Sequence, residues 1–361
     1  MTPLMQDVTR YEDWLRRQCD VVEADLNYKH QRMLKGQHTF LRATYFRWAK
    51  RVKYFAGDCL DAPHVLAIGD CHVENFGTWR DGEGRQVWGV NDFDDAAVMP
   101  YTLDLVRLAT SATLAQKREA PALEVCAALL EGYVDGIQRP GPILLEQGHP
   151  WFGKLLHELN EKTKDFWQSF ERSQPADVPR EIERLFKRAL PATAKLNRIS
   201  PQQRGGGGLG RPRYSALATW NGGSIVREAK ALVPSSWDWA RGRKSATSRF
   251  ITVATGAYRS PDPFLYVTGG FILRRLAPES RKLDLDDVTK AGRGPHLLRA
   301  MGRDVGSIHA AHRRTPKVLD HLLHMPKTWL VDCVERSTNF VLEDFNVWRG
   351  LVPADDDARQ R

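Results

Sequence analysis

The sequence predicts an α+β fold with a mostly helical large lobe and a small antiparallel β lobe. Three observations support this prediction. Apolar residues recur at helical spacing through most of residues 1–195, strand-like runs and glycines fill residues 196–285, and helical spacing returns over residues 286–361. We therefore expect three segments with these boundaries, the last of which returns to the lobe formed by the first.

The first segment predicts helices, then two strands, then helices again. Apolar residues lie at helical spacing around Trp14 and around Phe46. Two apolar runs, HVLAIGD (64–70) and RQVWGVND (85–92), predict buried strands that each end in a loop, with a turn-rich DGEG between them. Further helices are expected over residues 100–118, which begin with a proline, and over 120–137 and 150–190.

The second segment predicts a small antiparallel sheet. The dipeptide Asn221-Gly222 separates the runs RYSALATW and SIVREAKAL, and a type I′ hairpin turn favours such a pair because both of its central residues need positive φ. A second strand pair is expected in PFLYVT and GFILRRLAP (263–278). The segments GPHLLRAMGRDVGSIHAAHRR and KTWLVDCVERSTNFVLEDFNVW then predict the C-terminal helices.

The composition is that of a globular protein. The 361 residues are 42% hydrophobic and 27% charged, which is enough to build sizeable cores. The net charge of +9 is spread along the chain and no nucleic-acid recognition motif accompanies it, so a solvated basic surface is the favoured interpretation. An anionic partner such as a nucleotide would also suit this charge, whereas a nucleic-acid partner is not expected.

Cysteine usage and hydropathy predict a cytoplasmic protein without a membrane anchor. The five cysteines are scattered and form no C-x-x-C pair, which favours a reducing compartment over a disulfide framework or a zinc ribbon. No stretch approaches the ~20 apolar residues that span a bilayer, and the N-terminus is too polar for a signal peptide.

The segments GDCHVENFG (69–77) and VNDFDDA (90–96) carry the most chemistry. Each follows a predicted strand, where a rigid scaffold usually presents functional groups. Asp70 and Asn75 are five residues apart, as in the kinase catalytic loop. The second loop supplies Asp92 and Asp94, whose oxygens suit a hard divalent cation. Taken singly, each has a structural alternative: a turn residue for Asp70, a loop amide for Asn75, and a solvated charge for the neighbouring Asp95.

A glycine cluster and a strand lysine form a second candidate site. The cluster can bring backbone N–H groups close to phosphate oxygens, although glycine runs also serve as flexible linkers. Lys230 lies in the second strand of the predicted hairpin, and Glu228 shares its face of that strand. A lone strand lysine otherwise faces solvent. The glycines of the cluster are Gly205, Gly206, Gly207, Gly208 and Gly210.

These motifs resemble those of known phosphotransferases. GDCHVENFG resembles the Gly-Asp-x-His-x-x-Asn element of the aminoglycoside and choline kinase-like enzymes, and VNDFDDAAVMPYTLDLVRL resembles their following Asp-containing strand and buried helix. More narrowly, nearly the whole chain resembles a bacterial family known only as a domain of unknown function, marked by GDxHxxNFG and a DFD segment. The resemblance implies a protein-kinase-like two-lobe fold that binds ATP and Mg²⁺.

The resemblance also implies roles for individual residues. Asp70 would be the catalytic base that accepts the proton of the acceptor hydroxyl, and Asp104 would brace the catalytic loop. The metal ligands would be Asn75, Asp92 and Asp94, and the groups on the nucleotide phosphates would be Gly205, Gly206, Gly207, Gly208, Gly210 and Lys230.

The order of these parts departs from that of ordinary kinases, in which the glycine-rich lobe precedes the catalytic loop. Here it follows, so the resemblance implies a circularly permuted fold in which FILRRLAP connects the lobes and MGRDVGSIHAAH leads toward the catalytic loop. Ile68 stands where many relatives have a histidine. No glutamate partner for Lys230 is apparent before Glu279, and Asp238 is a weak substitute.

The expected function is ATP- and magnesium-dependent transfer of a phosphoryl group to a hydroxyl of a small-molecule acceptor. Transfer of AMP on the same fold stays open. A non-catalytic nucleotide-binding regulatory protein is one alternative. A metallophosphoesterase is another, since Asp70-x-His72 resembles its first metal motif; His309 and His312 are not expected to be ligands.

Overall fold

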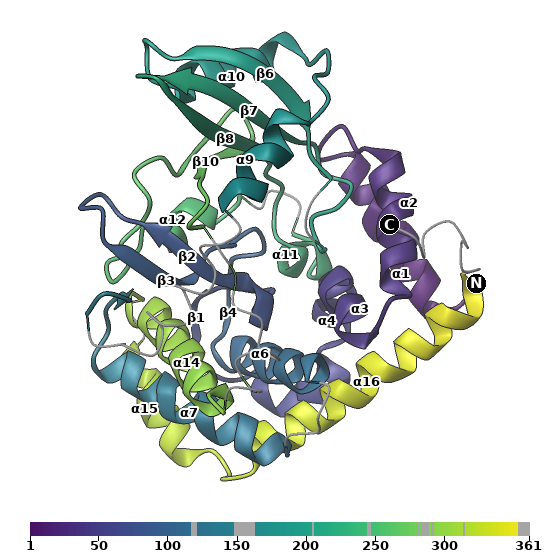
Figure 1. Cartoon of the computed structure of the whole chain (residues 1–361). Coiled ribbons are helices and arrows are strands. Elements are labelled where there is room, and N and C mark those ends of the chain that lie inside the picture. The colour runs from purple at the N-terminus through teal and green to yellow at the C-terminus, as the bar shows by residue number, and fades with distance from the viewer. Residues whose placement is uncertain are drawn as a thin grey trace.

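The structure is a computed structural model of the chain. It describes residues 1–116, 121–147, 163–203, 206–243, 247–280, 282, 289, 292–312 and 315–352. It combines helices with antiparallel sheets, so the α+β prediction is confirmed. Figure 1 shows a sheet with α9 and α10 at one end, a group of long helices at the other, and short strands between them.

The largest sheet has five antiparallel strands in the order β6-β7-β8-β10-β9. The predicted hairpin is confirmed: β7 pairs with β8 from Arg213 opposite Lys230 to Trp220 opposite Gly223. Asn221 (φ 47°) and Gly222 (φ 81°) adopt the positive angles that a type I′ turn requires. The strands are β6 (Lys195–Pro201), β7 (Arg213–Trp220), β8 (Gly223–Ala231), β9 (Tyr266–Thr268) and β10 (Phe271–Leu276).

Two helices pack on this sheet, and both begin before residue 196, where the second segment was expected to start. α10 (Arg180–Ala189) buries Ile182 and Phe186 against the sheet residues Ala216 and Ala229. α9 (Thr163–Glu171) buries Phe170 against Leu217 and Val226. The helices expected over 150–190 are found as α9 and α10, which the non-helical residues 172–179 separate, and residues 150–162 lie outside the described part.

The other end of the molecule is helical. α6 (Thr102–Ala115), α7 (Ala122–Gln138), α14 (Gly294–Ala310), α15 (Thr315–His324) and α16 (Trp329–Leu351) form it, and all but α15 were expected. α7 and α14 cross closely because glycines face backbone on both helices. A Cβ at Gly132 would lie 1.9 Å from the Arg299 oxygen, and one at Gly302 would lie 2.1 Å from the Leu129 oxygen.

Short strands lie between the helices and the large sheet. β1 (His64–Ala67) and β3 (Gln86–Val90) confirm the two predicted strands. Each gains a partner that was not foreseen: β1 pairs with β4 (Ala97–Pro100), and β3 pairs with β2 (Phe76–Arg80) and β5 (Ile143–Leu144). Pro100 therefore ends a strand, and the helix expected from residue 100 begins at Thr102.

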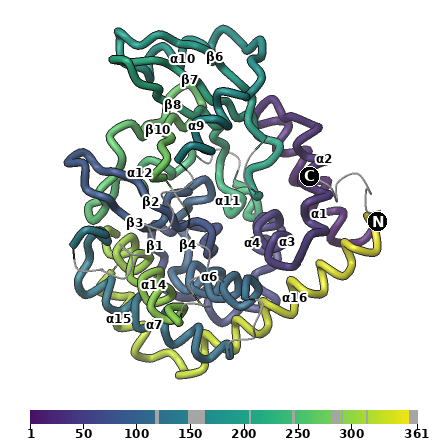
Figure 2. Tube along the Cα trace, in the orientation of Figure 1, coloured from purple at the N-terminus to yellow at the C-terminus, as the bar shows by residue number. Residues whose placement is uncertain are grey.

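The N-terminal helices lie beside the C-terminal helix, as the purple and yellow segments show in Figure 2. The Arg47 guanidinium donates to Asp7 of the first helix and, at 2.9 Å, to Asp344 of α16. The N-terminal helices are α1 (Pro3–Arg16), α2 (Glu23–Met33), α3 (Gln37–Ala43), α4 (Tyr45–Arg51) and α5 (Lys53–Ala56). Two short helices between β8 and β9 are α11 (Ser236–Ala240) and α12 (Phe250–Ala254), and the 3₁₀ turns are Gly57–Cys59 and Val73–Asn75.

Within the described ranges, no helix combines the length and the apolar character needed to cross a membrane.

Candidate functional site

The predicted site residues meet at one pocket of about 310 Å³. It lies between the loops that follow β1 and β3 and the large sheet. The pocket is lined by Asp70, Asn75, Asp92, Asp94, Gly206, Gly207, Gly208 and Lys230. Of the remaining predicted residues, Gly210 does not line it, and Gly205 lies outside the described residues.

Asp104 holds the loop that carries Asp70. Its carboxylate accepts hydrogen bonds from the backbone N–H groups of Ile68 (2.7 Å) and Gly69 (2.9 Å), which confirms the expected bracing role. The imidazole of His309 on α14 lies 3.0 Å from the same carboxylate, and the Tyr133 hydroxyl lies 3.0 Å from its other ring nitrogen. Helices from both helical segments, α6 and α7 of the first and α14 of the last, therefore fix the position of this loop.

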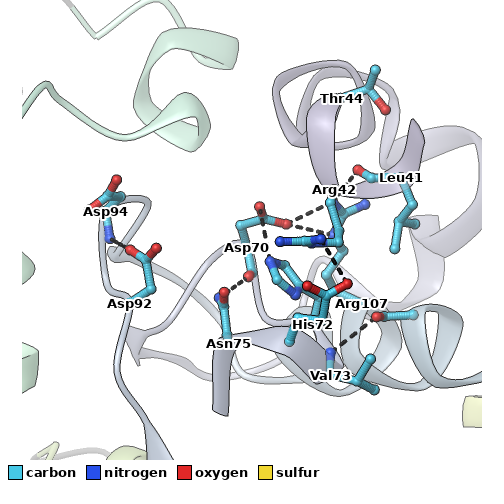
Figure 3. A network of polar contacts seen from close by, with 12 residues as sticks. Leu41, Arg42, Thr44, Asp70, His72, Val73, Asn75, Asp92, Asp94 and Arg107 are labelled. Carbon is cyan, nitrogen blue, oxygen red and sulfur yellow. Dashed lines mark hydrogen bonds and ion pairs between the residues drawn. The ribbon is translucent and has the colours of Figure 1, made fainter. Parts of the chain in front are cut away.

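Asp70 is oriented by a buried arginine from α6. Arg107 donates to Asp70 Oδ1 from Nε (3.0 Å) and Nη2 (2.7 Å), as Figure 3 shows. The Oδ2 atom lies 4.0 Å from His72 Nε2. Burial raises the pKa of Asp70 to about 6, an effect that Arg107 opposes and Asp95 reinforces. Burial also holds the pKa of His72 well below its usual range, so this imidazole is neutral.

Asn75 closes the Asp70 loop upon itself. Its Nδ2 donates to the backbone oxygen of Asp70 at 2.5 Å. The Asn75 N–H donates to the His72 oxygen, and the Asn75 oxygen accepts from Asn91 N–H at 2.9 Å, which joins the two loops. These contacts place Asn75 beside Asp70 and join its loop to the loop that carries Asp92.

Lys230 points into the pocket, as the sequence predicted. Its Nζ lies 3.5 Å from Asp92 Oδ2, although the two residues are far apart in the sequence. The same ammonium forms an ion pair with Asp94, which also accepts from Arg211 Nη1 at 3.0 Å. The loop aspartates thus supply the partner that the sequence did not reveal. Asp238 is not that partner: it accepts from Arg243 and lies at the start of α11.

The electrostatic surroundings shift the pKa values of Asp92 and Asp94 in opposite directions. Burial alone would raise the pKa of Asp92, but Lys230 holds it well below its usual range. Burial and the neighbouring Asp92 charge raise the pKa of Asp94. The Asp94 Oδ1 atom is buried and has no hydrogen-bond partner among the described residues. Asp95, which could have been a solvated charge, is buried and accepts from Ser236 N–H at 2.6 Å.

Glu228 shares the pocket with Lys230, as its place on the strand predicted, but it binds other cations. Arg274 Nε lies 2.6 Å and Arg213 Nη1 lies 3.5 Å from its carboxylate. Burial would raise the pKa of Glu228, and the two arginines lower it to about 2. Glu228 is therefore ionised, and it places two guanidinium groups beside the pocket.

The glycine turn lies directly over the site. A Cβ at Gly207 would lie 2.8 Å from the Arg42 backbone oxygen and 3.5 Å from Asp70 Oδ2. One at Gly208 would lie 3.1 Å from Lys230 Cε. Glycine is needed at Gly207 for this close approach. At Gly210 it is needed for another reason, because φ is +94° and a Cβ would lie 2.4 Å from Leu26 of α2.

The donors fit magnesium bound together with phosphates better than an independent metal centre. Mg²⁺ is usually held by one or two carboxylates plus substrate phosphates. Asp92, whose side chain is 36% exposed, and the unpartnered Oδ1 of Asp94 can supply such oxygens. In the part of the chain that the structure describes, no three His, Cys, Asp or Glu side chains gather into a metal-binding group.

Comparison with known proteins reaches only part of the chain. Residues 21–142 match the family described as "Uncharacterized protein conserved in bacteria (DUF2252)". This range contains Asp70, Asn75, Asp92 and Asp94 but ends before Lys230, so the resemblance expected over nearly the whole chain is found over about its first third. No curated protein and no solved structure matches the chain.

Sequence reasoning missed Arg107, which orients Asp70, and the arginines that line the pocket. Arg107 could have been found, because it is the one charged residue in LVRLATSATLA, an otherwise uncharged stretch that follows Asp104 by one position. Arg211 stands in a glycine-rich run, and Arg42 stands in TFLRATYF, far in the sequence from any candidate site residue. Their place at the pocket depends on the tertiary fold alone.

Proposed function

We propose that this protein is an ATP- and magnesium-dependent phosphotransferase that acts on a hydroxyl group of a small-molecule acceptor, with a kinase-like fold in circularly permuted order. One observation carries the proposal most: Lys230 of the sheet meets Asp92 and Asp94 in the pocket that also holds Asp70. Kinase-like enzymes need a strand lysine, a metal-binding aspartate and a base at one place.

The environment of Asp70 supports the role of general base. A base works best when its pKa lies near the working pH, and burial raises the pKa of Asp70 to about 6. Arg107 occupies Oδ1 and leaves Oδ2 for the acceptor. In this proposal Asp70 takes the hydroxyl proton while the hydroxyl oxygen bonds to the γ-phosphorus and the bond to the ADP oxygen breaks.

Lys230 and the glycine turn support phosphate binding. The Lys230 ammonium would exchange an aspartate partner for phosphate oxygens. The glycine turn passes close to both side chains, since a Cβ at Gly207 would lie 3.5 Å from Asp70 Oδ2 and one at Gly208 would lie 3.1 Å from Lys230 Cε. Magnesium, when bound, supplies neutralisation of the phosphate charge. Apolar side chains also line this pocket, among them Ile68, Leu265 and Leu276, and they offer a surface for the adenine ring of ATP.

The alternatives differ in what they require. A metallophosphoesterase needs a cluster of metal ligands, whereas the described residues hold none of three or more His, Cys, Asp or Glu. His309, which was not expected to be a ligand, is fully buried on Asp104. A non-catalytic nucleotide-binding protein needs no base, and the raised pKa of Asp70 favours the enzyme.

The test is ATP consumption with magnesium over a panel of hydroxylated metabolites, with Asp70→Asn as the paired variant. We expect at least one compound to stimulate the wild-type rate, and Asp70→Asn to lower the stimulated rate by a factor of about 10²–10⁴ while ATP still binds. Stimulation that is equal in both proteins would contradict the assignment of Asp70.

A further inference from the structure

Arg42 is a buried cation at the pocket with unused hydrogen-bonding capacity. It lies in α3 (Gln37–Ala43), is 8% exposed, and lines the pocket. Its Nη1 lies 2.7 Å from Glu74 Oε1, and its Nε has no hydrogen-bond partner among the described residues. A guanidinium carries five N–H donors, so one carboxylate contact leaves most of them for another group.

The place of Arg42 is defined by the glycine turn. Along this turn, Gly208 faces Lys230, Gly207 faces the Asp70 carboxylate, and Gly206 faces the Arg42 guanidinium, whose Cζ would lie 3.4 Å from a Cβ there. Arg42 therefore lies next to Asp70, on the side away from Lys230. Figure 3 shows its side chain beside those of Asp70 and His72.

At Arg42 the effect of burial on the pKa outweighs that of the neighbouring carboxylates. Burial lowers the pKa of Arg42 although Glu74 and Asp70 oppose this effect. Burial and the charge of Arg42 hold the pKa of His38 at about 3, and that of His72 well below its usual range, so both rings are neutral. The Glu74 side chain is 41% exposed, which weakens its attraction by solvent screening.

We infer that Arg42 binds an oxyanion directly beside Asp70. The inference rests on the proposed function, in which two groups of this chemistry come to Asp70: the phosphoryl group in transfer, and a carboxylate or phosphate on the acceptor. A guanidinium binds either with two parallel N–H···O bonds, which a lysine cannot reproduce. A cationic acceptor would instead be repelled at this place.

The first experiment titrates inorganic phosphate into the nucleotide-free protein and follows the heat of binding. We expect Arg42→Gln to weaken phosphate binding about 10-fold or more, as loss of a hydrogen-bonded charge does. Glu74→Gln removes the competing carboxylate from a half-exposed position and should strengthen phosphate binding. This opposite change does not depend on how well Arg42→Gln folds.

Arg303→Gln is the matched control. Arg303 is a half-buried arginine of α14 whose Nε lies 3.0 Å from Asp135 of α7. It does not line the pocket. It should leave phosphate affinity unchanged. Equal affinity in wild type, Arg42→Gln and Glu74→Gln would overturn the inference, and so would the lack of any phosphate binding by the wild type.

A second experiment separates the two sources of the oxyanion. Phosphate binding that still depends on Arg42 when magnesium and AMP-PNP fill the nucleotide site assigns Arg42 to the acceptor. If AMP-PNP and magnesium instead abolish phosphate binding, and Arg42→Gln weakens the binding of ADP–aluminium fluoride, Arg42 is assigned to the transferred group. A wild type that binds phosphate through Arg42 but neither nucleotide would refute the proposed function and keep the oxyanion site.

Discussion

At the scale of single residues, three carboxylates in one pocket differ in their affinity for protons. Burial raises the pKa of Asp70 and of Asp94, whereas Lys230 offsets the effect of burial at Asp92 and holds its pKa low. Carboxyl groups whose surroundings separate their pKa values in this way are typical of sites that divide acid–base and charge-stabilising roles. In this protein the division matches a base at Asp70 and a cation ligand at Asp92.

The pKa of Asp70 predicts how kcat/KM falls at low pH, that is, the acid limb of the pH profile. A base must be deprotonated to accept the acceptor proton, so kcat/KM should fall tenfold per pH unit as the pH drops below about 6. A pH series of the acceptor-stimulated ATP consumption measures this. Asp70→Asn should abolish the limb and leave a low, flat rate, whereas a limb that persists unchanged in Asp70→Asn would assign it to another group.

Asp92 and Asp94 should differ in their contribution to stability. Asp94→Ala leaves Lys230 and Arg211 without the carboxylate they share, in a place where the Asp94 side chain is only 10% exposed. Loss of one partner of a buried ion pair costs about 3–5 kcal/mol of unfolding free energy. Asp92 is 36% exposed, and its replacement by alanine should cost less than about 1 kcal/mol. Urea unfolding of both variants tests this; equal losses would contradict the geometry.

Many of the residues that sequence reasoning found lie on short loops with a fixed spacing. Asp70 and Asn75 stand in such a pattern, as does Asp92, and the structure brings all three to the pocket. Arg42 and Arg211 were missed because a cation that reaches a site from a distant helix or turn has no spacing relative to it. Gly210 was grouped with the phosphate glycines by proximity, although its positive φ and its contact with Leu26 explain it.

At the scale of elements, the crossing of α7 and α14 supports the loop that carries Asp70. Gly132 and Gly136 of α7 face backbone atoms of α14, and Gly302 and Gly306 of α14 face backbone atoms of α7, so the two backbones lie close together. The same pair of helices carries Tyr133 and His309, which reach Asp104. The spacing of glycines by four residues was present in both predicted helices and could have indicated this contact.

Alanine at Gly132 tests the crossing. The new Cβ would lie 1.9 Å from the Arg299 oxygen, which is backbone and cannot turn away as a side chain can. We expect a loss of about 1–3 kcal/mol of unfolding free energy, as for overpacked cores. Gly350→Ala on α16 is the control: nothing lies within 4 Å of its Cβ, and better helix propensity should add up to about 1 kcal/mol. A stabilising Gly132→Ala would contradict the close crossing.

The elements that the sequence predicted well are those whose pattern lies within one short segment of the chain. The β7–β8 hairpin follows from Asn221-Gly222, and α6 follows from its apolar periodicity. β2 and β4 were missed because each is four or five residues long and gains its identity from a partner strand: Phe76 lies opposite Val90, and Ala97 lies opposite Ala67. Such pairings are long-range contacts, which periodicity within one segment does not encode.

At the scale of the whole molecule, the two ends of the described chain are held together. Arg47 binds Asp7 of α1 and Asp344 of α16, and its Nη1 lies 3.4 Å from the Pro3 oxygen. The sheet inserted between the two helical segments is joined to them at the pocket through Lys230. Neighbouring ends are what a permuted chain order requires.

A circular permutant tests the relation between chain order and fold. Residues 352 and 1 would be joined by a flexible linker that replaces residues 353–361, and the chain would be opened between Gln174 and Pro175, which are exposed between α9 and α10. The permutant places the sheet before the Asp70 loop. We expect it to fold, with a melting temperature within several degrees of the wild type, because exposed loops tolerate new termini. Failure to fold, in a protein whose linker length has been varied, would contradict the independence of fold from chain order.

Lys230 and Asp92 are far apart in the sequence, and the proposed function requires them to form one magnesium-dependent nucleotide site. The most direct measurement is the equilibrium affinity for ATP with magnesium and with a chelator, in the wild type, Asp92→Ala and Lys230→Ala. We expect magnesium to tighten ATP binding in the wild type, Asp92→Ala to lose this dependence, and Lys230→Ala to weaken binding in both conditions. Equal affinities in all three proteins, or wild-type binding that magnesium does not change, would contradict the proposed function.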